Sequence, residues 1–124
     1  MDVLSARVIV YPAEFERSRR FYEAVLGLHI YREWGSGVVY FLGGAFLELS
    51  QGEPAGGAAP VALWLQVRDV NAEEARLRAL GVEVVKPAAR MPWGLVESWV
   101  LDPDGLVLHL VEVPPEHPLR SGRR

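Results

Sequence analysis

The stretch FYEAVLGL, residues 21–28, has a counterpart in ARLRALGV, residues 75–82. We predict that each stretch is the end of a helix, because each closes with a Leu-Gly pair and glycine commonly terminates helices. An aliphatic residue that opens a strand follows each glycine. The order strand, helix and group of short strands therefore occurs twice. We interpret the chain as two copies of one βαβββ module that can enclose a pocket.

Alternation of side chains outlines the strands of both modules, and helical spacing outlines their helices. In the first module we predict a helix over 14–26 and strands over 6–11, 28–34, 38–42 and 46–50. In the second we predict a helix that reaches residue 80 and strands over 62–67, 82–85, 95–101 and 106–113. Asn71 and Glu74 resemble a capping box at the start of the second helix.

The length of 124 residues, half of them hydrophobic, fits one compact domain rather than two independent ones. We predict a single domain over 1–113, made of module one at about 6–50, a linker at 51–60 and module two at about 61–113. The linker is rich in Gly, Ala and Pro. Residues 114–124 are predicted to form a mobile tail.

Composition excludes several classes of function. No apolar run approaches the roughly 20 residues of a membrane helix, and no signal peptide is visible, so we expect a cytoplasmic protein. The absence of cysteine excludes disulfides, a thiol nucleophile and a cysteine-based zinc site. The net charge of −3 argues against nucleic acid as a partner and slightly favours a cationic or neutral small ligand over an anionic one.

The alternation also assigns the two faces of each sheet. Apolar sets such as Leu47 with Leu49, and Leu63 with Leu65, suit the face that the helices cover. The opposite face is mostly apolar with a few polar groups, which is the composition expected of a small-molecule site. Its predicted members are Arg7, Ile9, Tyr11, Phe46, Glu48, Ser50, Ala62, Trp64, Gln66, Val107, His109 and Val111.

Three segments in order, 16–28, 80–82 and 102–105, carry a resemblance to the vicinal oxygen chelate superfamily. That group includes glyoxalase I, extradiol dioxygenases, fosfomycin-resistance enzymes and bleomycin-resistance proteins. The resemblance implies an α+β fold in which two βαβββ modules form a cupped mixed sheet with helices on the outer face. It also implies a small-molecule ligand and a homodimer.

Family enzymes hold a divalent metal through the first and last strand of each module, and the matching positions here are Arg7, Glu48, Ala62 and His109. Only Glu48 and His109 are competent ligands, and a permanent cation at position 7 would repel a metal. We therefore favour no metal cofactor and expect Arg7 to take the electrostatic place of the metal by pairing with Glu48. The alternative is an exposed Arg7 beside a solvated Glu48.

The sequence is similar to the bleomycin-resistance branch in its Pro92-Trp93-Gly94 loop and in His109. We predict metal-independent binding of a partly planar molecule, rather than catalysis, with aromatic contacts from Trp64 and Trp93. Two alternatives stay open. One is a metal-dependent glyoxalase-like lyase, isomerase or extradiol-type dioxygenase that uses Zn, Ni, Mn or Fe on Glu48 and His109, with Tyr11 or Gln66 as substitutes. The other is a dimeric interaction module with a vestigial pocket.

Overall fold

A computed structural model describes residues 2, 4–5, 7–52 and 61–118. The chain divides into two compact units, Met1–Ala59 and Pro60–Arg124, and each is described by itself. The division falls in the predicted linker, of which residues 53–60 lie outside the described residues. The same holds for residues 119–124 of the predicted tail.

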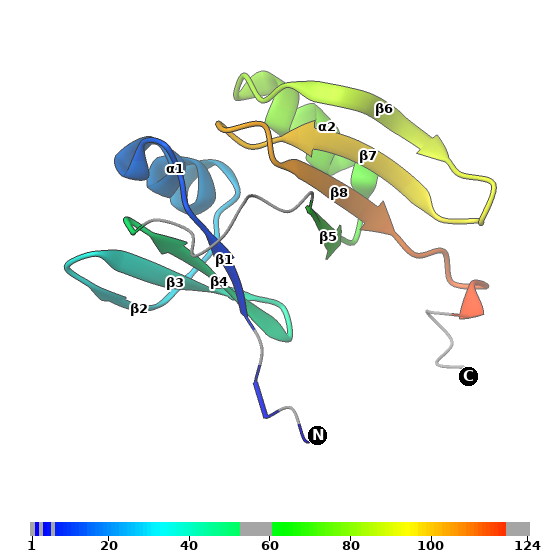
Figure 1. Cartoon of the computed structure of the whole chain (residues 1–124). Helices are drawn as coiled ribbons and strands as arrows, with labels where there is room; N and C mark the ends of the chain where they lie inside the picture. Colours follow the sequence, from blue (N-terminus) through cyan, green and yellow to red (C-terminus); the bar gives the residue numbers. More distant parts are fainter. Residues whose placement is uncertain (1, 3, 6, 53–60, 119–124) are drawn as a thin grey trace. The chain divides into compact units, whose positions relative to one another are not determined.

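The first unit is a four-stranded mixed sheet with one helical segment (Figure 1). The strand order is β1-β4-β3-β2; β1 and β4 are parallel and the other neighbours are antiparallel. The elements are β1 (Arg7–Val10), α1 (Phe15–Arg20), the π-helix η1 (Phe21–Val25), β2 (Ile30–Trp34), β3 (Gly37–Leu42) and β4 (Ala45–Ser50).

The second unit repeats this topology, with the order β5-β8-β7-β6 and a parallel β5–β8 pair. Its elements are β5 (Ala62–Gln66), α2 (Val70–Ala79), β6 (Val84–Arg90), β7 (Val96–Leu101) and β8 (Val107–Glu112). The α+β class and the two βαβββ modules are therefore confirmed. Neither α-helix in the described residues is long and apolar enough to cross a bilayer.

In each unit the helix covers the face that the alternation assigned to it. Leu47 and Leu49 of β4 are fully buried in the first unit, and so is Leu108 of β8 in the second. α2 contributes the buried Val70 and Leu77 and packs on β6, β7 and β8. Burial of these apolar side chains is the main force that holds each helix to its sheet.

The first helical segment differs from the continuous α-helix that we predicted over 14–26. It changes at Phe21 to π geometry, in which the Leu26 amide donates to the Phe21 carbonyl at 2.9 Å. Apolar spacing indicates which face of a helix is buried, but it does not distinguish a bond to the fourth preceding residue from one to the fifth.

Two predicted boundaries in the second unit are wrong. Asp69, not Asn71, caps α2, and its carboxylate accepts from the Ala72 amide at 3.0 Å. β6 runs over Val84–Arg90 rather than 82–85, and so includes Pro87. β6 is an edge strand with an irregular register, which is where a residue without an amide hydrogen is tolerated.

Candidate functional site

We call the sheet face without a helix the open face of each unit. On the open face of the first unit, Nη1 of Arg7 lies 2.7 Å from Oε1 of Glu48. The parallel register explains the contact, because it pairs Arg7 with Phe46 and Ile9 with Glu48, so these four side chains share one face. The predicted ion pair is therefore present; its side chains are 36% exposed for Arg7 and 14% for Glu48. Tyr11 lies beyond the end of β1 and is exposed.

Three aromatic rings form a cluster on the same open face. The centroid of Tyr31 lies 5.1 Å from that of Phe41 and 4.8 Å from that of Phe46. Tyr31 joins them because β2 has a register shift between Ile30 and Arg32. Such an irregularity changes which side chains reach a face, and strict alternation did not predict it. Tyr31 and Phe41 each remain about half exposed.

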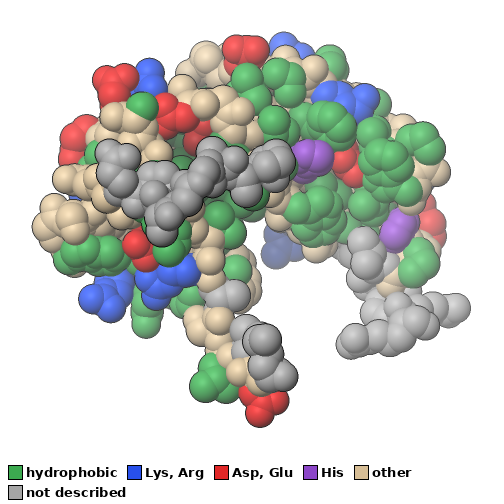
Figure 2. Space-filling view, viewed as in Figure 1, with side chains coloured by type: hydrophobic (Ala, Val, Ile, Leu, Met, Phe, Trp, Pro, Cys, Tyr) green, Lys and Arg blue, Asp and Glu red, His purple; other side chains and the backbone are tan. Residues whose placement is uncertain are grey.

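Four side chains line up across the open face of the second unit, and we call them the tryptophan row. Cross-strand pairing places Trp64 of β5 beside His109 of β8, His109 beside Trp99 of β7, and Trp99 beside Lys86 of β6. The rings of Trp99 and His109 are 4.4 Å apart, and Nζ of Lys86 lies 5.7 Å from the centre of Trp99. Hydrophobic side chains and a histidine lie together at the surface over β7 and β8 (Figure 2).

A buried carboxylate organises this row. Glu97 is only 3% exposed, and the alternation of β7 places it on the same face as Trp99. Its Oε1 accepts from the Trp99 indole at 2.9 Å, and its Oε2 accepts from the Trp93 indole at 2.7 Å. Nδ1 of His109 lies 3.7 Å from Oε1. The two indole hydrogen bonds fix the orientation of both rings, which leaves Trp93 half exposed.

The start of the predicted tail also contacts the loop at 91–94. Nε2 of His117 contacts the Trp93 carbonyl oxygen at 3.1 Å. Below the loop, Leu95, Val111 and Val113 form a small buried cluster. Val111 was predicted on the accessible surface; it does lie on the open face, but this packing buries it completely.

The predicted site residues are thus divided between two settings. Arg7 and Glu48 meet in the first unit. In the second unit, Trp93 and His109 contact Glu97, and Trp64 lies beside His109. Gln66 and Ala62 lie on the second open face and are exposed. Glu97 and Lys86 were not predicted as site residues. Alternation in the strand 95–101 would have found Glu97, whereas Lys86 lay beyond the predicted end of its strand.

Within each unit, the donor groups of the described residues do not form the three-ligand set that a catalytic zinc site typically has. In the described residues, no three His, Cys, Asp or Glu side chains gather as a possible ligand group. The Glu48 carboxylate is engaged by a guanidinium, and both oxygens of Glu97 accept indole hydrogens. No step of a mechanism is therefore assigned to a metal.

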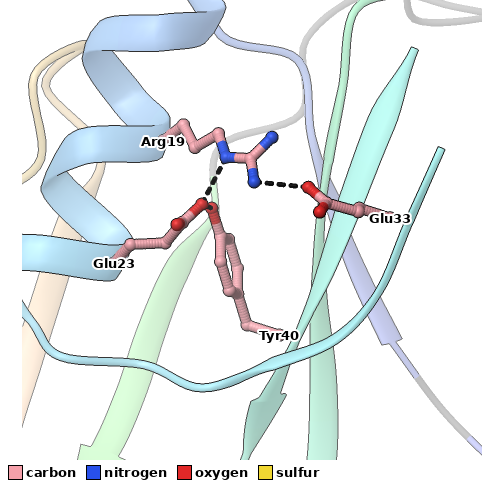
Figure 3. Close-up of polar contacts among 4 residues, drawn as sticks. All are labelled: Arg19, Glu23, Glu33 and Tyr40. Atoms are coloured by element: carbon pink, nitrogen blue, oxygen red, sulfur yellow. Dashed lines mark hydrogen bonds and ion pairs between the residues drawn. The ribbon is translucent and has the colours of Figure 1, made fainter. Parts of the chain in front are cut away.

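A polar network on the helix face of the first unit has a structural role (Figure 3). Arg19 of α1 bridges Glu23 of η1 and Glu33 of β2, and the Tyr40 hydroxyl donates to Glu23 at 2.8 Å. Burial, and then the hydrogen bond to Glu23, raises the pKa of Tyr40, so the phenol stays protonated. The hydrogen bond to Glu33 is the largest cause that raises the pKa of Arg19. The network joins the helical segment to β2 and β3.

Residues 5–110 match the family model described as the glyoxalase/bleomycin resistance protein/dioxygenase superfamily. No curated protein is significantly similar to the chain in sequence.

Solved structures of other proteins share the fold of this chain. TioX from Micromonospora sp. ML1 has a TM-score of 0.75 at 23% identity, over 89% of this chain and 98% of that one. A glyoxalase-related enzyme from Fulvimarina pelagi has a TM-score of 0.72 at 25% identity, over 88% and 87%. Lactoylglutathione lyase from Agrobacterium tumefaciens has a TM-score of 0.71 at 20% identity, over 86% and 91%. At these identities the likeness identifies the fold.

Proposed function

Because the chain belongs to the glyoxalase/bleomycin resistance protein/dioxygenase superfamily, we propose that it binds a small, partly planar molecule without a metal ion. The observation that carries this proposal is the tryptophan row. An open sheet face presents Trp64, which is half exposed, beside the adjacent, mutually tilted rings of His109 and Trp99. Flat apolar rings beside polar groups suit a planar ligand.

The rings are also held in fixed orientations, which favours binding. The Glu97 carboxylate accepts the indole hydrogens of Trp93 and Trp99 while it is almost fully buried. Aromatic side chains that are already ordered lose little conformational freedom when a ligand stacks on them.

The Arg7–Glu48 pair supports binding without a metal. Arg7 occupies one of the positions that the resemblance assigns to a metal ligand, and its guanidinium engages the carboxylate of Glu48, a second such position. An arginine is always charged and has no lone pair to donate to a cation. The proposal is of sequestration as in bleomycin-resistance proteins, and bleomycin need not be the natural ligand.

We test the proposal with three planar probes of one shape: naphthoate, naphthylmethylammonium and naphthylmethanol. The full chain is treated with EDTA, and binding is followed by calorimetry and tryptophan fluorescence. We expect binding that EDTA does not alter. Trp64→Ala should weaken every bound probe by roughly fivefold or more, because a stacked aromatic ring contributes about 1 kcal/mol beyond its buried area.

Leu80→Ala is the matched control, because Leu80 is also half exposed but lies at the C-terminal end of α2. It should leave all affinities unchanged. Failure of all three probes to bind contradicts the proposal. Binding or turnover that appears only after Zn, Ni, Mn or Fe is added would favour the enzyme alternative instead.

We further propose that the protein is a cytoplasmic homodimer. A chain without cysteine needs no oxidising compartment to fold. The half-exposed rings of Tyr31 and Phe41 on the first open face are apolar area that a second copy could cover.

A further inference from the structure

The single lysine of the chain lies on the proposed ligand face. Lys86 belongs to β6, and its ammonium lies 5.7 Å from the centre of the Trp99 ring. Within the part of the chain that the structure describes, no carboxylate oxygen forms a salt bridge with this ammonium. An ammonium has three donor hydrogens, and contact with an indole face leaves them available to a ligand.

The carboxylate that contacts the row is closed to a ligand. Glu97 is 3% exposed, and each of its oxygens accepts an indole hydrogen from Trp93 or Trp99. A cationic ligand therefore has no free carboxylate to pair with in the tryptophan row. What a ligand meets there is aromatic surface with a lysine ammonium at one end of the row.

On the basis of the proposed function, we infer that the tryptophan row selects planar molecules that carry a carboxylate or a similar anionic group. The ligand ring stacks on the exposed aromatic surface, and the anionic group pairs with Lys86. The acidic net charge of the chain, −3, favoured cationic or neutral ligands, but net charge describes the whole surface and not one face.

The three probes of one shape separate charge from stacking. Naphthoate should bind most tightly and naphthylmethylammonium most weakly. Added salt should weaken the binding of naphthoate and leave the binding of neutral naphthylmethanol unchanged. Lys86→Met keeps an apolar stem against Trp99 and removes the charge. It should weaken naphthoate about threefold to tenfold and change naphthylmethanol by less than about twofold.

Two further variants complete the experiment. Lys86→Arg keeps the charge and should retain the preference for naphthoate. Arg90→Met removes a more exposed cation from the end of the same strand, where Arg90 faces Glu116 at 3.6 Å, and should leave the preference unchanged. Circular dichroism verifies that each variant is folded.

The possible results distinguish this inference from the proposed function. If no probe binds, the proposed function fails and this inference fails with it. If the probes bind but the cation binds as well as naphthoate, or Lys86→Met leaves the naphthoate affinity intact, the inference alone is overturned.

Discussion

Glu74 joins α2 to the two strands at one edge of the second sheet. Its Oε1 accepts from the Ala88 amide at 2.6 Å and from the Ser98 hydroxyl at 2.7 Å, and its Oε2 accepts from Arg78 at 3.4 Å. Burial acts to raise the pKa of Glu74, but these hydrogen bonds outweigh burial and lower the pKa from its usual 4.5. A lowered pKa in the folded state means that the unfolded chain binds more protons in this range.

The stability that Glu74 contributes is therefore full above pH 4.5 and is lost as the pH falls through the lowered folded value. We expect Glu74→Gln to lower the free energy of unfolding by about 1–3 kcal/mol at neutral pH, because it removes charge-assisted hydrogen bonds. The difference from the wild type should shrink below pH 4.5. Urea titrations across this range measure both quantities.

Glu73→Gln is the matched control, because Glu73 is on the same helix and pairs with Arg76 at the surface. It should cost little at any pH, as exposed pairs contribute at most about 1 kcal/mol. A difference between Glu74→Gln and the wild type that stays constant below pH 4.5 would contradict the assigned role.

Single residues of the site could be predicted where a strand was correctly bounded. The Arg7–Glu48 pair followed from side-chain alternation and from the family pattern, and the structure contains it. Lys86 was missed because the predicted strand ended at residue 85, whereas β6 continues to Arg90. Alternation within β7 places Glu97 on the open face, but it does not predict the hydrogen bond from Trp93, because a loop brings Trp93 to Glu97 from outside the strand.

At the scale of elements, the two helices end in related but unequal ways. After α2, the Val82 amide donates to the Leu77 carbonyl and the Gly81 amide to that of Arg78, with Gly81 at φ 84°. After η1, the Leu28 amide donates to the Tyr22 carbonyl, which spans one residue more. The π turn accounts for the extra residue, and the repeat of Leu-Gly conceals it in the sequence.

Both glycines adopt a left-handed backbone, so their replacement tests the repeat. Gly27 has φ 76° and Gly81 has φ 84°, and a Cβ at either position would meet no atom within 4 Å. The cost of Gly27→Ala or Gly81→Ala is then one of backbone conformation alone, about 1–2 kcal/mol. Thermal or urea unfolding should give similar losses for the two variants.

Gly35→Ala serves as the comparison, because its added Cβ also meets no atom within 4 Å and its φ is not in the left-handed region. It should change the free energy of unfolding by less than about 0.5 kcal/mol. Equal losses at all three glycines, or none at any, would contradict the conformational explanation.

For the whole molecule, the duplication was visible because helix ends and strand alternation recur in the same order. The two sheets have corresponding strand orders, β1-β4-β3-β2 and β5-β8-β7-β6. What the repeat does not give is the chemistry of each copy. One open face carries an arginine–glutamate pair and an aromatic cluster, and the other carries a tryptophan row over a buried carboxylate. Equivalent positions on a shared fold hold different side chains, so fold alone does not give function.

The proposed homodimer is a prediction at this scale. The chain should sediment with twice its own mass of 13.8 kDa. Large patches of exposed apolar side chains are uncommon on monomers and commonly mark the surface that a second copy covers. Tyr31→Ser combined with Phe41→Ser removes two half-exposed rings from the first open face and should shift the equilibrium towards monomer. Leu80→Ser removes a comparably exposed side chain at the C-terminal end of α2 and should leave the dimer intact. Analytical ultracentrifugation over a range of concentrations decides between the outcomes, and a wild-type chain that is monomeric at every concentration rejects the dimer.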